Sequence, residues 1–313
     1  MSLPISVVMP AYNAALNLAA AVDSVLSQTF EKFELIIIDD GSSDNTLYIA
    51  KEYSLKDERI VVIPQENRGA AVARNTGISM ARGKYIAFLD ADDVWDSRKL
   101  DLHFNHLEAN ENLGMSFARV VYMMPDGTPT DRISSAKLTN IIPKDFFFEN
   151  LAVTPSNSVC RKDALIQVGC FDESFQNLGF EDVELFLRII CSDWAIEGLD
   201  YPLIFYRLSE SGASSNLDNM YNGWYSLVEK MRVFSPDLVE DNYKYAKANM
   251  LRYLSRRAIR LGLDGKTALK YSLLSIQTDW TLMVKEPRRS IATFLASLLS
   301  TVPIVPKKLP IFR

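Results

Sequence analysis

Tyr85-Ile-Ala-Phe-Leu-Asp-Ala-Asp-Asp93 is the stretch that decides the fold, because an apolar run there leads directly into three carboxylates. A short uninterrupted apolar run is typical of a buried strand in a parallel sheet, and open α/β sheets bind ligands at the carboxyl ends of such strands. Neighbouring carboxylates repel one another unless a cation lies between them, and their oxygens suit Mg²⁺ or Mn²⁺. The stretch therefore predicts either a divalent-metal site at a strand end or a solvated acidic turn.

Three further strands precede this stretch and alternate with helices. Apolar runs predict strands at 5–9, 33–38 and 59–63, and helical spacing predicts helices at 16–28, 45–55 and 67–82. This order predicts an α/β fold with a mostly parallel sheet and helices on both faces. Polar clusters follow three of the four strands: Tyr12 with Asn13, Asp39 with Asp40, and Asp90 with Asp92 and Asp93. Because parallel strands end at one edge of the sheet, the clusters should converge, which favours the metal site over the acidic turn.

Other nucleotide-binding folds fit the sequence less well. A dinucleotide-binding Rossmann unit needs G-x-G-x-x-G after the first strand, but this chain has Pro10-Ala-Tyr-Asn-Ala-Ala-Leu16 there, without a glycine. A Walker A loop is also absent from the sequence. A phosphatase of the aspartyl-phosphate type would carry its aspartates after the first strand, whereas Asp90-Ala-Asp-Asp-Val94 follows the fourth.

Composition and charge restrict the class of protein. The chain has 313 residues, 48% of them hydrophobic, and a net charge of 34 − 39 = −5. This acidic balance argues against nucleic-acid binding, which normally shows a basic surface. Three widely spaced cysteines suggest neither a disulfide framework nor a zinc site. The sequence shows no signal peptide and no apolar run long enough to cross a bilayer, so we expect a cytoplasmic location.

Five sequence blocks occur in a consistent order along residues 4–215. They are Val7-Val-Met-Pro-Ala-Tyr-Asn13, Asp39-Asp-Gly-Ser-Ser-Asp44, Asn67-Arg-Gly with Ala73-Arg-Asn75, Gly83-Lys-Tyr-Ile-Ala-Phe-Leu-Asp-Ala-Asp-Asp93, and Val168-Gly-Cys-Phe-Asp-Glu173 leading to Phe180-Glu-Asp-Val-Glu-Leu-Phe-Leu-Arg188. Together they resemble the inverting nucleotide-sugar glycosyltransferases of family 2, which have the GT-A fold. The resemblance implies a nucleotide-diphosphate sugar as donor, most often a UDP-sugar, a Mn²⁺ or Mg²⁺ ion, and a glycan or lipid-linked acceptor.

The resemblance also implies roles for the residues at the strand ends. Asp92 would bind the metal, with Asp90 binding it through water or contacting the ribose, while Asp93 could be structural. Asp40 would accept a hydrogen bond from the base and Asp39 would hold the loop, although the sequence does not separate this pair. Arg74 could contact diphosphate or pair with an aspartate of the metal cluster. The remaining residues implied for the nucleotide pocket are Pro10, Ala11, Tyr12, Asn13, Arg68 and Ala91. For Tyr12 the alternative is a core tyrosine.

Glu181 and Asp182 are the catalytic pair implied by the resemblance. Asp182 would be the general base that takes the proton of the acceptor hydroxyl, and Glu181 would support it by contacting acceptor or donor sugar. The alternative is that both carboxylates only stabilise the N-terminus of the helix that follows. Arg188 lies one to two turns further on and could orient the pair or contact the donor.

One departure from the family pattern concerns the third metal ligand. Ser209 stands where many members have a histidine after Tyr206-Arg207. Diphosphate and water could complete the metal's coordination, or Arg207 could supply positive charge, and Ser211 could bind phosphate in a donor-covering loop. The chain's only histidines, His103 and His106, lie on a predicted helix elsewhere.

The rest of the chain is predicted to complete the sheet and add a helical appendage. Residues 113–160 should finish a mixed sheet, and Phe146–Phe148 with Asn150 could face the acceptor or belong to the core. We expect a GT-A domain at 1–217 and helices at 218–313. The final 30 residues carry six basic residues and one acidic residue around an uncharged run at 290–306. This tail could lie at the cytoplasmic membrane face, pack on the appendage, or form a homodimer contact.

Two alternatives to a glycosyltransferase come from other functional classes. A non-catalytic protein could keep the nucleotide-sugar pocket, but the intact Glu181-Asp182 pair argues against it. A sugar nucleotidyltransferase would carry a glycine-rich basic loop after the first strand, which the sequence lacks.

Overall fold

The computed structural model describes residues 3–175, 178–208 and 216–302, and the chain divides into two compact units. Unit 1 consists of residues 1–142, 150–176 and 181–209. Unit 2 consists of residues 210–313 together with the short segments 143–149 and 177–180. The helical region therefore includes two segments that lie far upstream of residue 217.

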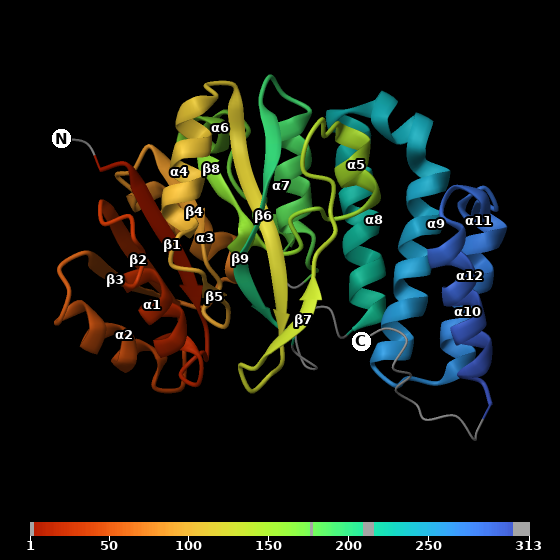
Figure 1. Cartoon of the computed structure of the whole chain (residues 1–313), viewed down its shortest axis with the longest axis horizontal. Coiled ribbons are helices and arrows are strands. Elements are labelled where there is room, and N and C mark those ends of the chain that lie inside the picture. The colour runs from red at the N-terminus through yellow and green to blue at the C-terminus, as the bar shows by residue number, and fades with distance from the viewer. Residues whose placement is uncertain (1–2, 176–177, 209–215, 303–313) are drawn as a thin grey trace. The chain divides into compact units, whose positions relative to one another are not determined.

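Unit 1 is built on one mixed sheet with the strand order β3-β2-β1-β4-β8-β6-β9-β5, and β7 pairs with β6 at the side (Figure 1). The strands are β1 (Ile5–Ala11), β2 (Phe33–Asp40), β3 (Ile60–Gln65), β4 (Tyr85–Phe88), β5 (Val94–Trp95), β6 (Leu113–Met123), β7 (Pro129–Ile133), β8 (Val159–Arg161) and β9 (Ala195–Arg207). The first four strands of the chain pair in parallel, whereas β8 is antiparallel to both β4 and β6. The mixed, mostly parallel sheet expected in the first part of the chain is confirmed.

Parallel pairing brings the predicted strand ends together. Ala11 at the end of β1 lies opposite Asp39 of β2, and β4 runs alongside β1 with Phe88 opposite Val8. The polar clusters that follow β1, β2 and β4 therefore emerge at one edge of the sheet, where ligands of open α/β sheets bind.

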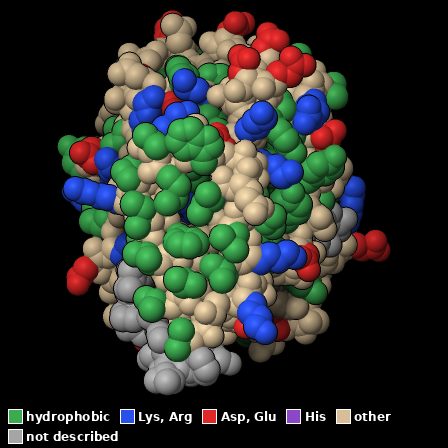
Figure 2. Space-filling model, turned by 90° about the vertical axis from the view of Figure 1, so that its right-hand side faces the viewer, with side chains coloured by type: hydrophobic (Ala, Val, Ile, Leu, Met, Phe, Trp, Pro, Cys, Tyr) green, Lys and Arg blue, Asp and Glu red, His purple; other side chains and the backbone are tan. Residues whose placement is uncertain are grey.

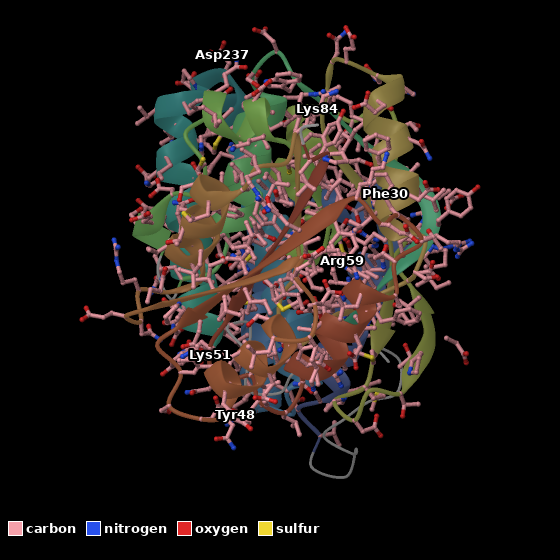
Figure 3. All side chains as sticks on the ribbon, turned by 90° about the vertical axis from the view of Figure 1, so that its left-hand side faces the viewer. Phe30, Tyr48, Lys51, Arg59, Lys84 and Asp237 are labelled. Carbon is pink, nitrogen blue, oxygen red and sulfur yellow. The ribbon has the colours of Figure 1, made fainter. Side chains whose placement is uncertain are left out.

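Helices cover both faces of this sheet. They are α1 (Leu18–Leu26), α2 (Thr46–Ser54), α3 (Ala70–Met80), α4 (Lys99–Ala109), α6 (Lys162–Gln167) and α7 (Glu181–Ile190), with short 3-10 turns at Pro155–Asn157 and Glu173–Phe175. Apolar side chains of α1, α2 and α4 share one core with alternate residues of β1 and β2. On the solvent side of α2, Tyr48 and Lys51 are exposed (Figure 3). Because α3 packs against the other residues of β1 and β2, it lies on the opposite face.

Helix α3 ends earlier than the sequence predicts. The sequence predicts a helix over 67–82, but α3 ends at Met80, and Gly83, which follows it, has no positive φ. A Cβ at Gly83 would lie 2.5 Å from the backbone nitrogen of Ser6. Glycine is therefore needed there because the chain entering β4 passes directly over β1, which the sequence pattern does not reveal.

Unit 2 is helical in its described residues. Its helices are α5 (Pro143–Phe148), α8 (Leu217–Phe234), α9 (Pro236–Arg260), α10 (Gly265–Thr278), α11 (Leu282–Lys285) and α12 (Pro287–Leu299). Arg252 of α9 is buried and donates to Glu286, which immediately precedes α12, at 2.8 Å. Within the described ranges, every helix is too short or too polar to cross a bilayer.

Candidate active site

The turn that follows β4 holds the three aspartates in a compact arrangement. The Asp93 amide donates to the carbonyl of Asp90 at 3.1 Å, which closes the turn, and the Asp90 amide donates to Ser156 Oγ at 2.9 Å. The Asp93 carboxylate is buried and accepts the backbone amide of Arg207 at 2.9 Å. Asp93 thus connects the turn to the end of β9, while Asp90 and Asp92 remain partly exposed.

The electrostatics of this turn are unfavourable without a cation. Burial, followed by the charge of Asp90, raises the pKa of Asp92 to about 6. Burial and the charges of Asp92 and Asp90 raise the pKa of Asp93 well above its usual value. No side chain in the described part of the chain donates a hydrogen bond to the Asp92 carboxylate. A divalent cation would relieve this repulsion, so the donor set fits a hard metal ion.

The turn offers only a small number of protein ligands for such an ion. Among the described residues, no three His, Cys, Asp or Glu side chains converge in a metal-binding arrangement. His103 and His106 of α4 both contact Ser116 Oγ, at 2.7 and 2.8 Å. Ser209, which replaces the expected histidine, lies outside the described residues. A metal at Asp90 and Asp92 would need further ligands from substrate and water, as Mg²⁺ commonly has.

Arg74 of α3 connects the acidic turn to Glu181, the neighbour of Asp182. Its buried guanidinium donates to Asp90 Oδ1 at 2.8 Å and to Glu181 Oε1 at 3.0 Å. Burial alone would lower the pKa of Arg74, but the charges of Asp90 and Glu181 outweigh it and raise the pKa above its usual value. Of the two alternatives for Arg74, the geometry supports pairing with an aspartate of the metal cluster.

Asp182 is a buried carboxyl at the start of α7, with 8% of its surface exposed. Its Oδ1 accepts the Val183 amide and its Oδ2 accepts Asn150 Nδ2, both at 2.8 Å. Burial, followed by the charge of Glu181, raises the pKa of Asp182 to about 7, although both hydrogen bonds and Arg74 oppose the shift. A carboxyl whose pKa lies near neutrality is suited to accept a proton during catalysis.

Asn150 is a site residue whose role the sequence did not reveal. Its Oδ1 accepts the amides of Ala152 and Val153 at 3.2 and 3.1 Å, so its amide group cannot rotate and its Nδ2 faces Asp182. Val153 has φ +74°, which is unfavourable for a β-branched residue and typically costs about 1–3 kcal/mol. The sequence placed Asn150 only among the residues that could face the acceptor, and no local pattern identifies a partner 32 residues away.

The loops after β1 and β2 are bonded to each other. Asn13, with φ +48°, accepts the Ser43 backbone amide on its Oδ1 at 2.8 Å. Its own backbone amide donates to Ser42 Oγ at 3.0 Å. The neighbouring Tyr12 ring is 55% exposed, so it is not a core tyrosine and its face is open to a ligand. Pro10 and Ala11 form the end of β1 beneath this ring, with Ala11 buried, and Ala91 is buried in the acidic turn.

Asp39 and Asp40 differ in how many of their oxygens are already bonded. Asp40 Oδ1 accepts Gln65 Nε2 at 2.7 Å and the Arg68 amide at 3.0 Å, and its Oδ2 accepts the Gly69 amide at 2.8 Å. Asp39 is equally buried, but its Oδ1 has no hydrogen-bond partner. The loop-holding contacts therefore belong to Asp40, and the residue with an open acceptor is Asp39, the reverse of the roles expected from the sequence.

Three predicted donor-binding residues lie in different surroundings. Arg68 is exposed and lies 3.7 Å from Glu173. Arg207 donates to the backbone carbonyls of Asp92 and Pro125, at 2.8 and 2.9 Å, so its charge lies beside the acidic turn. Ser211 lies outside the described residues.

Arg188 requires a correction. Its guanidinium is buried and donates to both carboxylate oxygens of Glu184, at 2.7 and 2.6 Å, and to the carbonyls of Val168 and Cys170. The bonds to the Val168 and Cys170 carbonyls hold the 168–170 loop against α7. We therefore withdraw Arg188 as a donor ligand, because its charge is already compensated and turned away from solvent.

An open groove of about 520 Å³ lies next to the acidic turn within unit 1. Val94, which follows Asp93, and Arg207 line it, together with Leu16 and Asn17 just before α1 and Ala20 within α1. The β6–β7 hairpin, including Met123 and Pro125, also lines the groove.

Known proteins resemble this chain in both sequence and fold. Residues 6–169 match the family model described as glycosyl transferase family 2. The chain is 33% identical over 214 residues to the putative teichuronic acid biosynthesis glycosyltransferase TuaG of Bacillus subtilis, covering 68% of this chain and 82% of that protein. It is also 33% identical over 216 residues to the UDP-Glc:alpha-D-GlcNAc-diphosphoundecaprenol beta-1,3-glucosyltransferase WfgD of Escherichia coli, covering 68% of this chain and 80% of that protein.

Among solved structures, the mannosyltransferase PcManGT of Pyrobaculum calidifontis, in complex with GDP-Man and Mn²⁺, matches with a TM-score of 0.60. The match covers 95% of this chain and 86% of that chain at 17% identity, a likeness that shows the fold alone. The family model covers more than half of the chain, and two relatives agree with it over two thirds of the sequence. The chain therefore belongs to glycosyl transferase family 2 and is a glycosyltransferase of GT-A fold.

Proposed function

We propose that this protein transfers a sugar from a nucleotide-diphosphate sugar to an acceptor hydroxyl, with inversion at the anomeric carbon and with a divalent metal ion. The observation that carries the proposal is the chain of contacts from Asp90 through Arg74 to Glu181, next to Asp182. These contacts connect a carboxylate turn suited to a metal-bound diphosphate with a buried carboxyl suited to accept a proton.

Asp182 acts in this proposal as the general base. It takes the proton of the acceptor hydroxyl while that oxygen bonds to the anomeric carbon and the bond from that carbon to the diphosphate oxygen breaks. A single displacement of this kind inverts the configuration and needs no covalent intermediate. The pKa near 7 supports this role, because the carboxylate is available at neutral pH and can still bind a proton. Arg74, bonded to both Glu181 and Asp90, would hold these two carboxylates in place.

Asp92 is the proposed metal ligand, with Asp90 as its partner, and the ion is Mg²⁺ or Mn²⁺. When bound, it would stabilise the negative charge that develops on the leaving diphosphate. The raised pKa of Asp92 supports this assignment, because a group crowded by like charge gains most from a cation. The Mn²⁺ in the PcManGT complex agrees with it.

The nucleotide base is proposed to stack on the exposed ring of Tyr12 and to donate a hydrogen bond to Asp39, whose Oδ1 is free. We favour UDP as the nucleotide because the relative WfgD acts on UDP-Glc. Arg68 is proposed to contact the diphosphate, because its side chain is exposed just before α3, whose first N–H groups favour anions.

The acceptor is proposed to be a growing glycan or a lipid-linked sugar at the cytoplasmic face of a membrane. The names of TuaG and WfgD support this assignment, since one refers to teichuronic acid synthesis and the other to a diphosphoundecaprenol acceptor. The three cysteines are unpaired, which agrees with a reducing compartment.

Replacing Asp182 tests the proposed base. Asp182→Asn should lower the transfer rate by about 10²–10⁴-fold, while the affinity for nucleotide with Mn²⁺ changes little. The measurements are steady-state transfer and calorimetry on the same preparation. Asp163→Asn, an exposed aspartate on α6, is the matched control and should behave as the native enzyme. Transfer by Asp182→Asn that stays within about tenfold of the native rate would exclude Asp182 as the base.

Replacing Asp92 tests the metal site separately. In the native protein, the nucleotide should bind more tightly with Mn²⁺ than with a chelator. In Asp92→Ala, this Mn²⁺-dependent increase in affinity should be smaller by about tenfold or more. Asp131→Ala, an exposed aspartate on β7, provides the control. If Mn²⁺ strengthens nucleotide binding equally in Asp92→Ala and the native protein, the metal is held elsewhere.

A further inference from the structure

The helices α10 and α12 of unit 2 bury their small residues and expose their large apolar ones, the reverse of a helix on the surface of a water-soluble protein. The buried residues of α10 are Gly265, Ala268, Ser272 and Ser275. The buried residues of α12 are Ser290, Thr293, Ala296 and Ser297. Such small-residue contacts between helices are typical of proteins whose outer surface faces lipid.

The exposed sides of the same helices carry leucine and isoleucine. In α12, Ile291, Leu295, Leu298 and Leu299 follow one another at spacings of four, three and one, so they form a single stripe, and each is about half exposed. Leu273 and Leu274 are exposed on α10, and Trp280 and Val284 beside α11 are 66% and 68% exposed. We call these eight side chains the apolar face of unit 2.

The inverted orientation is held in place by specific contacts. Ser275 Oγ donates to the Ala248 carbonyl at 2.7 Å, and Ser255 Oγ of α9 donates to the Ala268 carbonyl at 2.8 Å. A Cβ at Gly265 would lie 2.1 Å from the Ser300 carbonyl oxygen, so the end of α12 packs directly against the start of α10. A larger side chain than that of glycine has no room at this contact.

Positive charge accompanies the apolar face. Residues 265–302 contain Lys266, Lys270, Lys285, Arg288 and Arg289 against Asp279 and Glu286, a net charge of 5 − 2 = +3. The rest of the chain therefore carries −5 − 3 = −8. Figure 2 shows hydrophobic side chains gathered over the middle of the side that it draws, with Lys and Arg around them and most acidic groups toward the rim. Glu286 is paired with Arg252 and Arg289, and Arg289 is also paired with Glu149, so the excess of cations comes from Lys266, Lys270, Lys285 and Arg288.

We propose that the apolar face of unit 2 docks this protein on an anionic lipid bilayer. The exposed leucines would lie among the acyl chains at the interface, and the surrounding lysines and arginines would contact lipid phosphates. Trp280 provides an indole of the kind enriched at membrane interfaces. The inference stands apart from the proposed reaction, because it needs neither donor nor acceptor.

A second copy of the chain fits the face less well than a bilayer. Contact between two copies across a twofold axis would bring the same positive excess to both sides of the interface. An anionic surface compensates this charge and also covers the leucines. The apolar and charged features therefore agree on the same occupant.

Flotation with vesicles tests the docking. The full chain, without donor, should float with phosphatidylcholine vesicles that contain roughly one third phosphatidylglycerol, and much less with phosphatidylcholine alone. Leu295→Glu combined with Leu298→Glu should reduce the bound fraction about tenfold, because two charges then lie in the apolar stripe. Leu55→Glu with Val233→Glu is the matched control, since both positions are strongly exposed outside the face.

Trp280 gives a second readout that does not depend on the glutamate variants. Of the four tryptophans, Trp95 and Trp224 are buried and Trp194 is partly exposed in unit 1, so the part of a vesicle-induced blue shift that disappears in Trp280→Phe comes from Trp280. Native protein that neither floats nor shifts its emission overturns the proposal. If Leu295→Glu with Leu298→Glu converts a dimer to a monomer in light scattering while flotation stays unchanged, the face is a contact between copies and the proposal also fails.

Discussion

At the scale of single residues, opposing effects set the pKa of Asp182. Burial and the charge of Glu181 favour the protonated carboxyl, whereas Asn150, the Val183 amide and Arg74 favour the carboxylate. The folded value of about 7 lies above the usual value of 3.8. Folding therefore favours the protonated form, and the contribution of this group to stability decreases as the pH rises through that interval. The proposed activity has the opposite dependence, because a base must be deprotonated.

Replacing Asn150 should move the pH profile of transfer. The acid limb of kcat/KM should lie near pH 7 in the native enzyme. In Asn150→Ala it should move upward by about one unit, since a hydrogen bond that favours the carboxylate is lost. Asn150→Asp keeps the oxygen that accepts Ala152 and Val153 but adds a negative charge, so its limb should move further. Profiles that superimpose for the three proteins would contradict a direct contact of Asn150 with the base.

At the scale of elements, α3 positions Arg74 by packing unusually close to the sheet. Gly77 lies one turn after Arg74, and a Cβ there would come within 2.3 Å of Val8 Cγ1 and 3.0 Å of Ile38 Cδ1. The absence of a side chain therefore lets α3 approach β1 and β2. This approach brings the guanidinium of Arg74 between Asp90 and Glu181, which come from elements 91 residues apart in sequence.

Gly77→Ala should test this close packing. The added methyl group should lift α3 and lower the free energy of unfolding by about 1–3 kcal/mol. Transfer should fall as well, measured at a temperature where the variant remains folded, because Arg74 moves with the helix. Ser79→Ala on the exposed side of α3 should change stability by less than about 0.5 kcal/mol. A fully active and equally stable Gly77→Ala protein would show that α3 does not require this contact.

At the scale of the whole molecule, charge and apolar surface are distributed unevenly. Residues 265–302 carry +3 within a chain of net charge −5. Unit 1 has a conventional apolar core beneath its sheet, whereas α10 and α12 of unit 2 bury serine, threonine, alanine and glycine. Under the two proposals, unit 1 binds the sugar donor and unit 2 docks on a lipid bilayer.

The salt dependence of vesicle binding should separate the contribution of the cations from that of the leucines. Raising the ionic strength from about 0.01 M to about 1 M shortens the Debye length from about 30 Å to about 3 Å. The bound fraction on anionic vesicles should fall but not vanish, because the leucines remain buried in lipid. Lys270→Gln with Arg288→Gln should weaken binding at low salt more than at high salt, and Lys51→Gln on α2 with Lys56→Gln just after α2 should not. Binding that is independent of salt would remove the role of the cations.

The alternation of strands and helices and the edge at which Asp39, Asp90 and Tyr12 gather follow from sequence alone. These features depend on local periodicity and on the rule that parallel strands end together. The family blocks likewise indicated Asp182 as the candidate general base. Only the tertiary structure assigned the bonded oxygens to Asp40 rather than Asp39, because their donors come from a loop 25 to 29 residues away.

Tertiary contacts also decided which arginines are available and which side of a helix faces outward. Arg188 looked suited to the donor until Glu184 and two backbone carbonyls were found to hold it. The helices of unit 2 were predictable from their spacing, but their orientation was not, since a stripe of leucines is normally assigned to the core. Whether such a stripe lies inside or outside depends on the fit between neighbouring helices, and here the small residues pack closely enough to leave the leucines outside.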